Sequence, residues 1–193
     1  LVTLVGVKFT EAGGAAQRAV DGICAQLGQE RRNPPPPAPA LPGGEMESLT
    51  ALRAEMAVAL AQFPGGCAAL DEECMDHLVT MYGTAAPRVL QAAAGDREHL
   101  ERVTPESPVI GAQVVYSLRH EMALGLDDIV MRRTELGARG DADERAIDRC
   151  GAIAAREAGW SEARLERELT ALGAALQRSR IGFENRDGDA NRS

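Results

Sequence analysis

Four consecutive prolines at residues 34–37 limit most strongly how this chain can fold. Proline lacks a backbone N–H and fixes φ, so the run cannot continue a helix or a sheet and favours extended polyproline II. Gly43 and Gly44 loosen the end of the same segment. We therefore predict a linker at residues 29–46, semi-rigid in its middle. A ligand for a proline-binding domain is the alternative.

Before the linker, the sequence predicts one strand followed by one helix. The apolar run at residues 2–5 is typical of a strand buried on both faces, and Gly6 ends it. From Thr10 onward apolar residues recur at helical spacing, and Gly28 follows as a C-terminal stop. A single strand leaves its backbone groups unpaired, so residues 1–28 need a sheet from elsewhere.

After the linker, residues 47–185 are predicted to form an all-α domain, followed by a polar tail at residues 186–193. Capping and stop residues divide residues 47–180 into five to seven helices. The longest apolar stripe is predicted to be buried, and it comprises Val114, Val115, Leu118 and Met122. The predicted starts and stops are Ser48, Pro64, Gly83, Pro87, Gly137, Asp141 with Glu144, and Ser161.

Composition narrows the class of protein. The chain of 193 residues is 45% hydrophobic but only 3% aromatic, which favours alanine-rich helices in close contact. A net charge of −8 argues against nucleic acid and anionic membrane surfaces as partners. No apolar stretch reaches the roughly 20 residues of a membrane span, and no signal peptide is evident. We therefore expect a cytoplasmic protein.

The four cysteines show no paired framework, which is typical of reduced thiols in a cytosolic protein. They are Cys24, Cys67, Cys74 and Cys150. Cys67 and Cys74 could be imagined as metal ligands together with His77, but their spacing matches no standard zinc pattern. The sequence therefore predicts no metal site.

The turn between the predicted strand and helix could hold an anion. A helix N-terminus presents free N–H groups and positive charge, and the glycine at position 6 lets a ligand approach the backbone. Lys8 adds a full positive charge, and Thr10 lies at the helix start. A purely structural turn is the commoner meaning of such a pattern.

Other motifs are incomplete. The sequence has no GxGxxG and no GxxxxGK[ST], and His120-Glu121 lacks the second histidine of a zinc-protease helix. Arg132 and Arg133 could bind an anion, although such pairs more often form salt bridges, here with Asp127, Asp128 or Glu135. No catalytic set is therefore predicted from spacing alone.

Three stretches together resemble a known family. LVGVKFTEAGGAAQRAVD is similar to the flavin-proximal segment of FAD-dependent glycerol-3-phosphate dehydrogenases and oxidases, where a strand ends in a G-x-K-x-T turn. YGTAAPRVL and AQVVYSLRHEMALGLDDIVMRRTELG resemble the helical C-terminal domain of the same enzymes. The resemblance covers residues 1–28 and 75–172, with the order of the motifs preserved. It implies a mainly α fold, with residues 1–28 as the last βα unit of an FAD-binding α/β fold that begins before Leu1.

Members of this family oxidise sn-glycerol 3-phosphate to dihydroxyacetone phosphate and pass electrons to quinone or oxygen. The resemblance implies FAD as cofactor, held by Gly6, Val7, Lys8 and Thr10, with Lys8 also near the substrate phosphate. The family commonly continues as T-T-x-R, whereas Glu11 follows Thr10 here.

As partners, the resemblance implies glycerol 3-phosphate, an upstream FAD-binding domain and a quinone at a membrane surface, which could make the protein peripheral to the inner membrane. Formation of a homo-oligomer is possible and is left undecided by the sequence. This chain alone is expected to be inactive, because it lacks the dinucleotide-binding segment. The alternative is a non-catalytic helical protein-interaction module.

Overall fold

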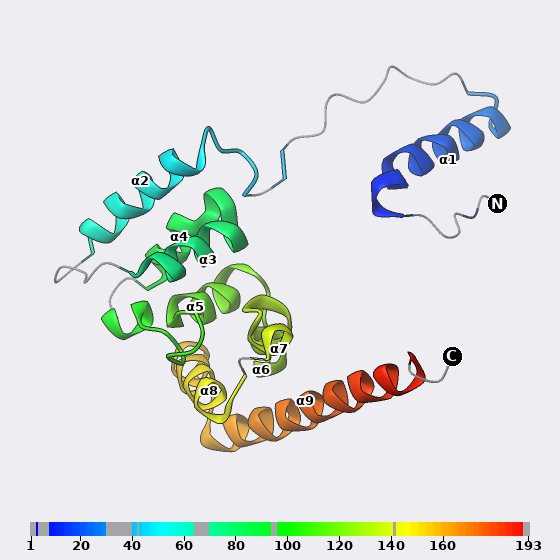
Figure 1. Cartoon of the computed structure of the whole chain (residues 1–193). Helices are drawn as coiled ribbons and strands as arrows, with labels where there is room; N and C mark the ends of the chain where they lie inside the picture. Colours follow the sequence, from blue (N-terminus) through cyan, green and yellow to red (C-terminus); the bar gives the residue numbers. More distant parts are fainter. Residues whose placement is uncertain are drawn as a thin grey trace. The chain divides into compact units, whose positions relative to one another are not determined.

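The computed structural model describes residues 3, 8–29, 40–41, 43–63, 70–93, 96–140 and 142–190. The chain divides into two compact units, residues 1–39 and 40–193. In the described part, secondary structure is helical apart from one isolated antiparallel bridge between Arg102 and Ile110 (Figure 1). The mainly helical fold class is thereby confirmed. Except for Thr3, the predicted strand lies outside the described residues, as does the run of four prolines.

The first unit contains the short 3₁₀ turn Phe9–Glu11 and helix α1, Ala12–Gln26. The helix ends as the sequence predicts, because Gly28 takes a left-handed φ of 62° and the N–H of Gln29 donates to the Cys24 carbonyl at 3.0 Å. One side of α1 carries exposed apolar residues, including Val20. The strand that should precede this helix stays a prediction.

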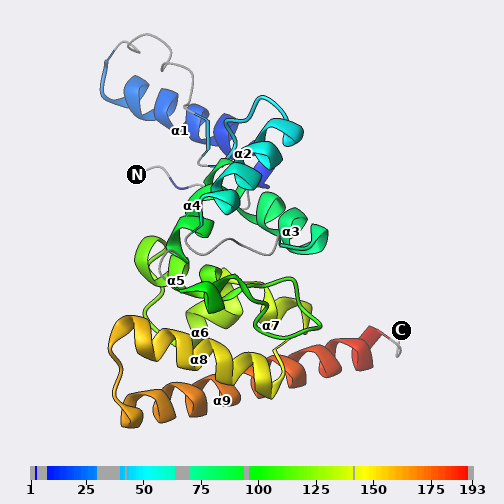
Figure 2. The same cartoon turned by 90° about the vertical axis from the view of Figure 1, so that its left-hand side faces the viewer.

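In the second unit, helix α5 lies at the centre (Figure 2). It packs against α4 on one side and α8 on the other, while α2 and α3 flank α4 and helix α9 lies along α8. No helix in the described part of the chain is long and apolar enough to cross a bilayer. The helices are α2 (Leu49–Ala61), α3 (Glu72–Tyr82), α4 (Ala86–Ala92), α5 (Gly111–His120), α6 (Leu126–Asp128), α7 (Leu136–Arg139), α8 (Glu144–Ala158) and α9 (Glu162–Ala190).

Side chains cap the helices where short polar residues precede apolar ones. Ser48 Oγ accepts the N–H of Ala51 at 3.1 Å, and Ser161 Oγ accepts that of Arg164 at 3.3 Å, both as predicted. The predicted cap at Asp141 is wrong. Asp143 caps α8 instead, because its carboxylate accepts the N–H of Ala146 at 2.7 Å, and Asp141 itself lies outside the described residues.

The helical stripe at the centre of the domain is shorter than predicted. Val114 and Val115 are fully buried and Leu118 packs partly buried against the core, but α5 ends at His120. Met122 is 83% exposed with φ 57°, so its place on the buried stripe is wrong. The chain leaves the helix at this point, where the Ala123 N–H donates back to the Ser117 carbonyl of α5 at 3.1 Å.

The segment after α5 is also more broken than predicted. The π-helical segment Ile129–Arg133 follows α6, and the left-handed Glu135, φ 57°, interrupts the helix before α7. Gly137 therefore does not end a helix but lies inside α7. The stop is Gly140 instead, whose φ is 82°.

The glycine end of the predicted linker lies against the helical domain. The Gly43 carbonyl accepts the N–H of Thr84 at 3.0 Å, and Gly83 takes a φ of 51° at the end of α3. An added Cβ on Gly83 would collide with the Gly43 carbonyl oxygen. Two backbone segments therefore approach so closely that only glycine fits at position 83.

Candidate functional site

The predicted flavin-side turn is described in part. Lys8 and Thr10 lie together on the turn directly before α1, and both are exposed. The Lys8 carbonyl accepts the N–H of Glu11 at 2.9 Å, which closes the turn. Gly6 and Val7, the other two predicted contacts, lie outside the described residues.

The N-terminus of α1 has no side-chain cap. Glu11 occupies the N-cap position of this 15-residue helix, but its side chain makes no capping hydrogen bond. With the helix dipole and Lys8, this arrangement suits an anion. The exposed Glu11 carboxylate opposes it, because it places negative charge at the same helix end.

A buried hydrogen-bond centre joins α3 to α5. Gln113 is fully buried, and its Oε1 accepts the N–H of Ile110 at 3.0 Å. That backbone donor fixes the amide orientation, so the Gln113 Nε2 points to Tyr82 Oη at 3.3 Å and His77 Nε2 at 3.2 Å. His77 Nε2 must then be the unprotonated ring nitrogen. The sequence analysis missed Gln113, although a lone glutamine in an apolar helix start is a visible signal.

The motifs of the helical domain meet beside this centre. The Tyr82 ring lies edge-on to Tyr116 with centroids 5.6 Å apart, and Tyr116 lies 4.8 Å from the His120 ring. Burial raises the pKa of Tyr82 above its usual range, and the nearby Glu121 adds to the shift while Arg133 opposes it. The tyrosine-glycine, tyrosine-acid and R-R-T stretches therefore converge on one place.

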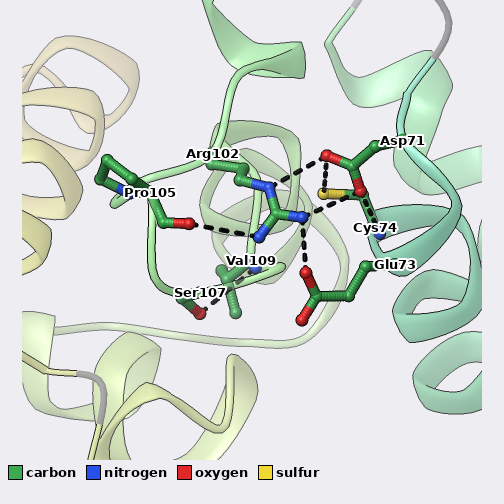
Figure 3. Close-up of polar contacts among 7 residues, drawn as sticks. All are labelled: Asp71, Glu73, Cys74, Arg102, Pro105, Ser107 and Val109. Carbon is green, nitrogen blue, oxygen red and sulfur yellow. Dashed lines mark hydrogen bonds and ion pairs between the residues drawn. The ribbon is translucent and has the colours of Figure 1, made fainter.

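Arg102 fastens a loop to the start of α3 (Figure 3). Its Nε and Nη2 donate to the two Asp71 carboxylate oxygens at 3.1 and 2.9 Å, and Nη2 also reaches Glu73 at 2.7 Å. Asp71 in addition accepts the N–H of Cys74 at 2.9 Å as the α3 cap. The pKa of Asp71 is lowered to about 2. The hydrogen bonds from Arg102 are the largest cause, and the hydrogen bond from the Cys74 N–H is the second.

Arg102→Met should therefore lower the free energy of unfolding by about 1–2 kcal/mol at neutral pH, a range kept low because the carboxylates are half exposed. The folded pKa of Asp71 is below its unfolded value, so this contribution is present above pH 4 and disappears as pH falls towards 2. Urea unfolding at pH 7 and pH 2.5 measures it. Arg132→Met is the control, because Arg132 also bridges two carboxylates but is 58% exposed. An equal loss in both variants would contradict a special role for Arg102.

A pocket of about 480 Å³ lies between α8 and the 3₁₀ turn Arg97–Leu100. Its arginines are already paired: Arg149 reaches Glu101 at 2.7 Å, and Arg156 reaches Asp96 at 2.7 Å. Arg156 also donates to His99 Nε2 at 2.8 Å, which keeps that nitrogen unprotonated, and burial lowers the pKa of His99. The pocket therefore offers neither an unneutralised cation nor a catalytic set.

Two further candidates from the sequence are Arg132 and the imagined metal ligands. Arg132 pairs with Asp127 at 2.9 Å and Asp128 at 2.6 Å, so the salt-bridge interpretation applies to it rather than anion binding. Within the described residues, no group of three or more His, Cys, Asp or Glu could hold a metal ion. Cys67, one of the imagined ligands, lies outside them.

Comparison with known proteins identifies the family. Residues 37–165 match the family described as the C-terminal domain of alpha-glycerophosphate oxidase. The glycerol-3-phosphate dehydrogenase of Synechocystis sp. is 28% identical over 174 residues, which cover 88% of this chain and 29% of that protein. The mitochondrial glycerol-3-phosphate dehydrogenases of Arabidopsis thaliana and Mesocricetus auratus are 32% and 31% identical, with 88% of this chain matched in both and 28% and 23% of those proteins covered.

The chain thus spans less than a third of the length of these relatives. The match covers more than half of the chain and falls on its helical domain, where the motifs converge. This chain belongs to the alpha-glycerophosphate oxidase C-terminal domain family, in which its relatives are glycerol-3-phosphate dehydrogenases.

Proposed function

We propose that this chain is the C-terminal part of a flavoprotein that oxidises sn-glycerol 3-phosphate to dihydroxyacetone phosphate and passes the electrons to quinone or oxygen. The observation that carries the proposal is the family match over residues 37–165, together with relatives named glycerol-3-phosphate dehydrogenase. The 193-residue chain by itself is expected to be inactive.

The turn before α1 supports a flavin-side role for the first unit. The exposed Lys8 and Thr10 lie at the N-terminus of α1, which no N-cap side chain occupies, and this positive end fits an anionic group. We propose that Gly6, Val7, Lys8 and Thr10 lie along the FAD, and that this unit completes an FAD-binding fold. These residues would hold FAD, which when bound would supply the hydride acceptor for oxidation of the substrate alcohol.

In this arrangement the residues of this chain would stabilise negative charge on the cofactor and on the substrate phosphate. The α1 N–H groups would stabilise negative charge at the edge of the reduced cofactor, since they point outward from the helix start. The Lys8 ammonium would neutralise part of the substrate phosphate, which selects the phosphorylated polyol over glycerol. Glu11 would weaken both effects, because its carboxylate is exposed at the same helix end.

The proposal is tested first on the longer polypeptide that contains this sequence. After purification, its visible absorption should show bound flavin, and it should reduce an electron-acceptor dye with glycerol 3-phosphate. The 193-residue chain should do neither. A longer protein without flavin and without turnover would contradict the proposed activity.

Lys8→Met in the longer protein should lower kcat/KM for glycerol 3-phosphate by roughly ten- to a hundredfold, because a lost charged phosphate contact costs about 1.5–3 kcal/mol. Turnover of unphosphorylated glycerol should change little. Lys8→Arg, which keeps the charge, should retain most of the preference. Arg18→Met is the matched control, because Arg18 is an exposed cation further along α1. Unchanged preference and flavin content in Lys8→Met would place Lys8 outside the site.

A further inference from the structure

The loop after α5, residues 121–125, presents two large apolar side chains to solvent. Met122 is 83% exposed and Leu124 is 75% exposed, whereas Ala123 between them is buried. The loop therefore alternates outward, inward and outward. Among the described large apolar side chains, Leu41 reaches a similar exposure of 81%, whereas Val20, Leu49 and Val58 are less exposed.

The backbone of this apolar loop is held in place on both sides of Met122. The N–H groups of Glu121 and Ala123 donate to the Ser117 carbonyl at 3.2 and 3.1 Å. The Leu124 N–H donates to Asp128 Oδ2 at 3.0 Å, and the Leu124 carbonyl accepts from Arg164 Nη2 at 3.1 Å. The exposed side chains are therefore preorganised, which reduces the entropy that a contact must overcome.

The backbone conformation of Met122 also contributes to this preorganisation. Its φ of 57° is left-handed, a region that a residue with an unbranched apolar side chain rarely adopts. Packing within the described residues does not require methionine there, because the side chain is mostly exposed. Glycine would adopt the same turn without strain. The turn that ends α5, in which the Ala123 N–H donates to the Ser117 carbonyl, therefore holds an apolar side chain outward at a position that glycine would fill without strain.

We propose that the apolar loop, through Met122 and Leu124, docks into an apolar recess on the rest of the same polypeptide, outside this sequence. This rests on the proposed function, in which the chain is part of a longer enzyme. The relatives are more than three times as long as the part that matches this chain, so in the proposed longer enzyme the recess would lie on the same polypeptide.

The apolar surface of Met122 and Leu124 is small, which favours a contact within one polypeptide over a contact between separate proteins. Each side chain offers roughly 100 Å² of apolar area, whereas a stable interface between separate proteins buries about 800 Å² on each partner. A contact within one polypeptide needs far less, because the tether supplies a high effective concentration. An anionic membrane is disfavoured by the net charge of −8 and by Asp127 and Asp128 beside the loop.

Thiol labelling tests the proposal. Met122→Cys would be prepared in the longer polypeptide and in the 193-residue chain, and its reaction with a maleimide would be followed after subtracting the native cysteines. We expect labelling at least tenfold slower in the longer polypeptide. Leu41→Cys is the reference, because Leu41 is 81% exposed in the same unit, and its rate should be similar in both.

Three results would overturn the proposal. These are equal labelling of Met122→Cys in the two proteins, protection that appears only at high protein concentration, and protection that needs phosphatidylglycerol vesicles. The second points to another copy and the third to a lipid surface. Flavin absorption is measured in the same samples, so that protection without flavin would support the docking contact while contradicting the proposed activity.

Discussion

Gly83→Ala is expected to lower the free energy of unfolding by about 3 kcal/mol or more, because it combines backbone strain with the loss of a close backbone contact. Gly83 has φ 51° and ψ −132°, a combination open almost only to glycine. An added Cβ would meet the Gly43 carbonyl oxygen, and backbone atoms cannot move aside as a flexible side chain can. Relief would require breaking the hydrogen bond from Thr84 N–H to that carbonyl.

Gly159→Ala is the matched control for this prediction. Gly159 also has a left-handed φ, 64°, and also ends a helix, but nothing lies within 4 Å of an added Cβ. Only the conformational cost remains there, about 1 kcal/mol. Urea unfolding of the two variants separates the close approach from the φ requirement. If both variants lost the same free energy, the contact between residues 43 and 83 would contribute nothing to stability.

Helix starts were predictable where the cause is local. A serine before an apolar helix needs only its own backbone geometry to cap it, and Ser48 and Ser161 both do so. The error at Asp141 has the same origin, because two aspartates precede α8 and only the structure shows that Asp143 makes the bond. The stripe that was extended to Met122 failed because periodicity does not show where a chain leaves its helix.

Contacts between distant residues could not be read from the sequence. Arg102 and Asp71 lie 31 residues apart, and neither position carries a local pattern that singles it out. The same holds for the backbone contact between Gly43 and Gly83, which requires the fold to bring two turns together. For the candidate site, the sequence predicted Lys8 and Thr10 on one turn, since neighbours in sequence are neighbours in space.

The convergence of the helical motifs is a property of the fold. Tyr82, Tyr116 and Arg133 come from three separate segments, and each alone is an ordinary helix residue. The resemblance grouped these stretches by family, while the packing of α3 against the α4–α5 core explains why they belong together. Gln113 of α5 is hydrogen-bonded to Tyr82 and His77 of α3, and its removal should therefore have a large effect.

Gln113→Leu is expected to lower the free energy of unfolding by about 3–4 kcal/mol, because it removes three buried hydrogen bonds at about 1–3 kcal/mol each. The Ile110 N–H would lose its acceptor, and Tyr82 Oη and His77 Nε2 would lose their shared donor. Leucine has nearly the same size and helix propensity, so packing and propensity contribute little to the difference.

Gln91→Leu in α4 provides the control, because Gln91 is exposed and the same exchange there should change stability by less than about 0.5 kcal/mol. Both variants would be measured by urea unfolding at pH 7, with near-ultraviolet circular dichroism reporting the packing of Tyr82 against Tyr116. We expect Gln113→Leu to weaken that signal even where the protein stays folded, since the Tyr82 hydroxyl is no longer held. A stability loss no larger than that of Gln91→Leu would mean that the buried centre repacks without the amide, and that its hydrogen bonds do not hold α3 against α5.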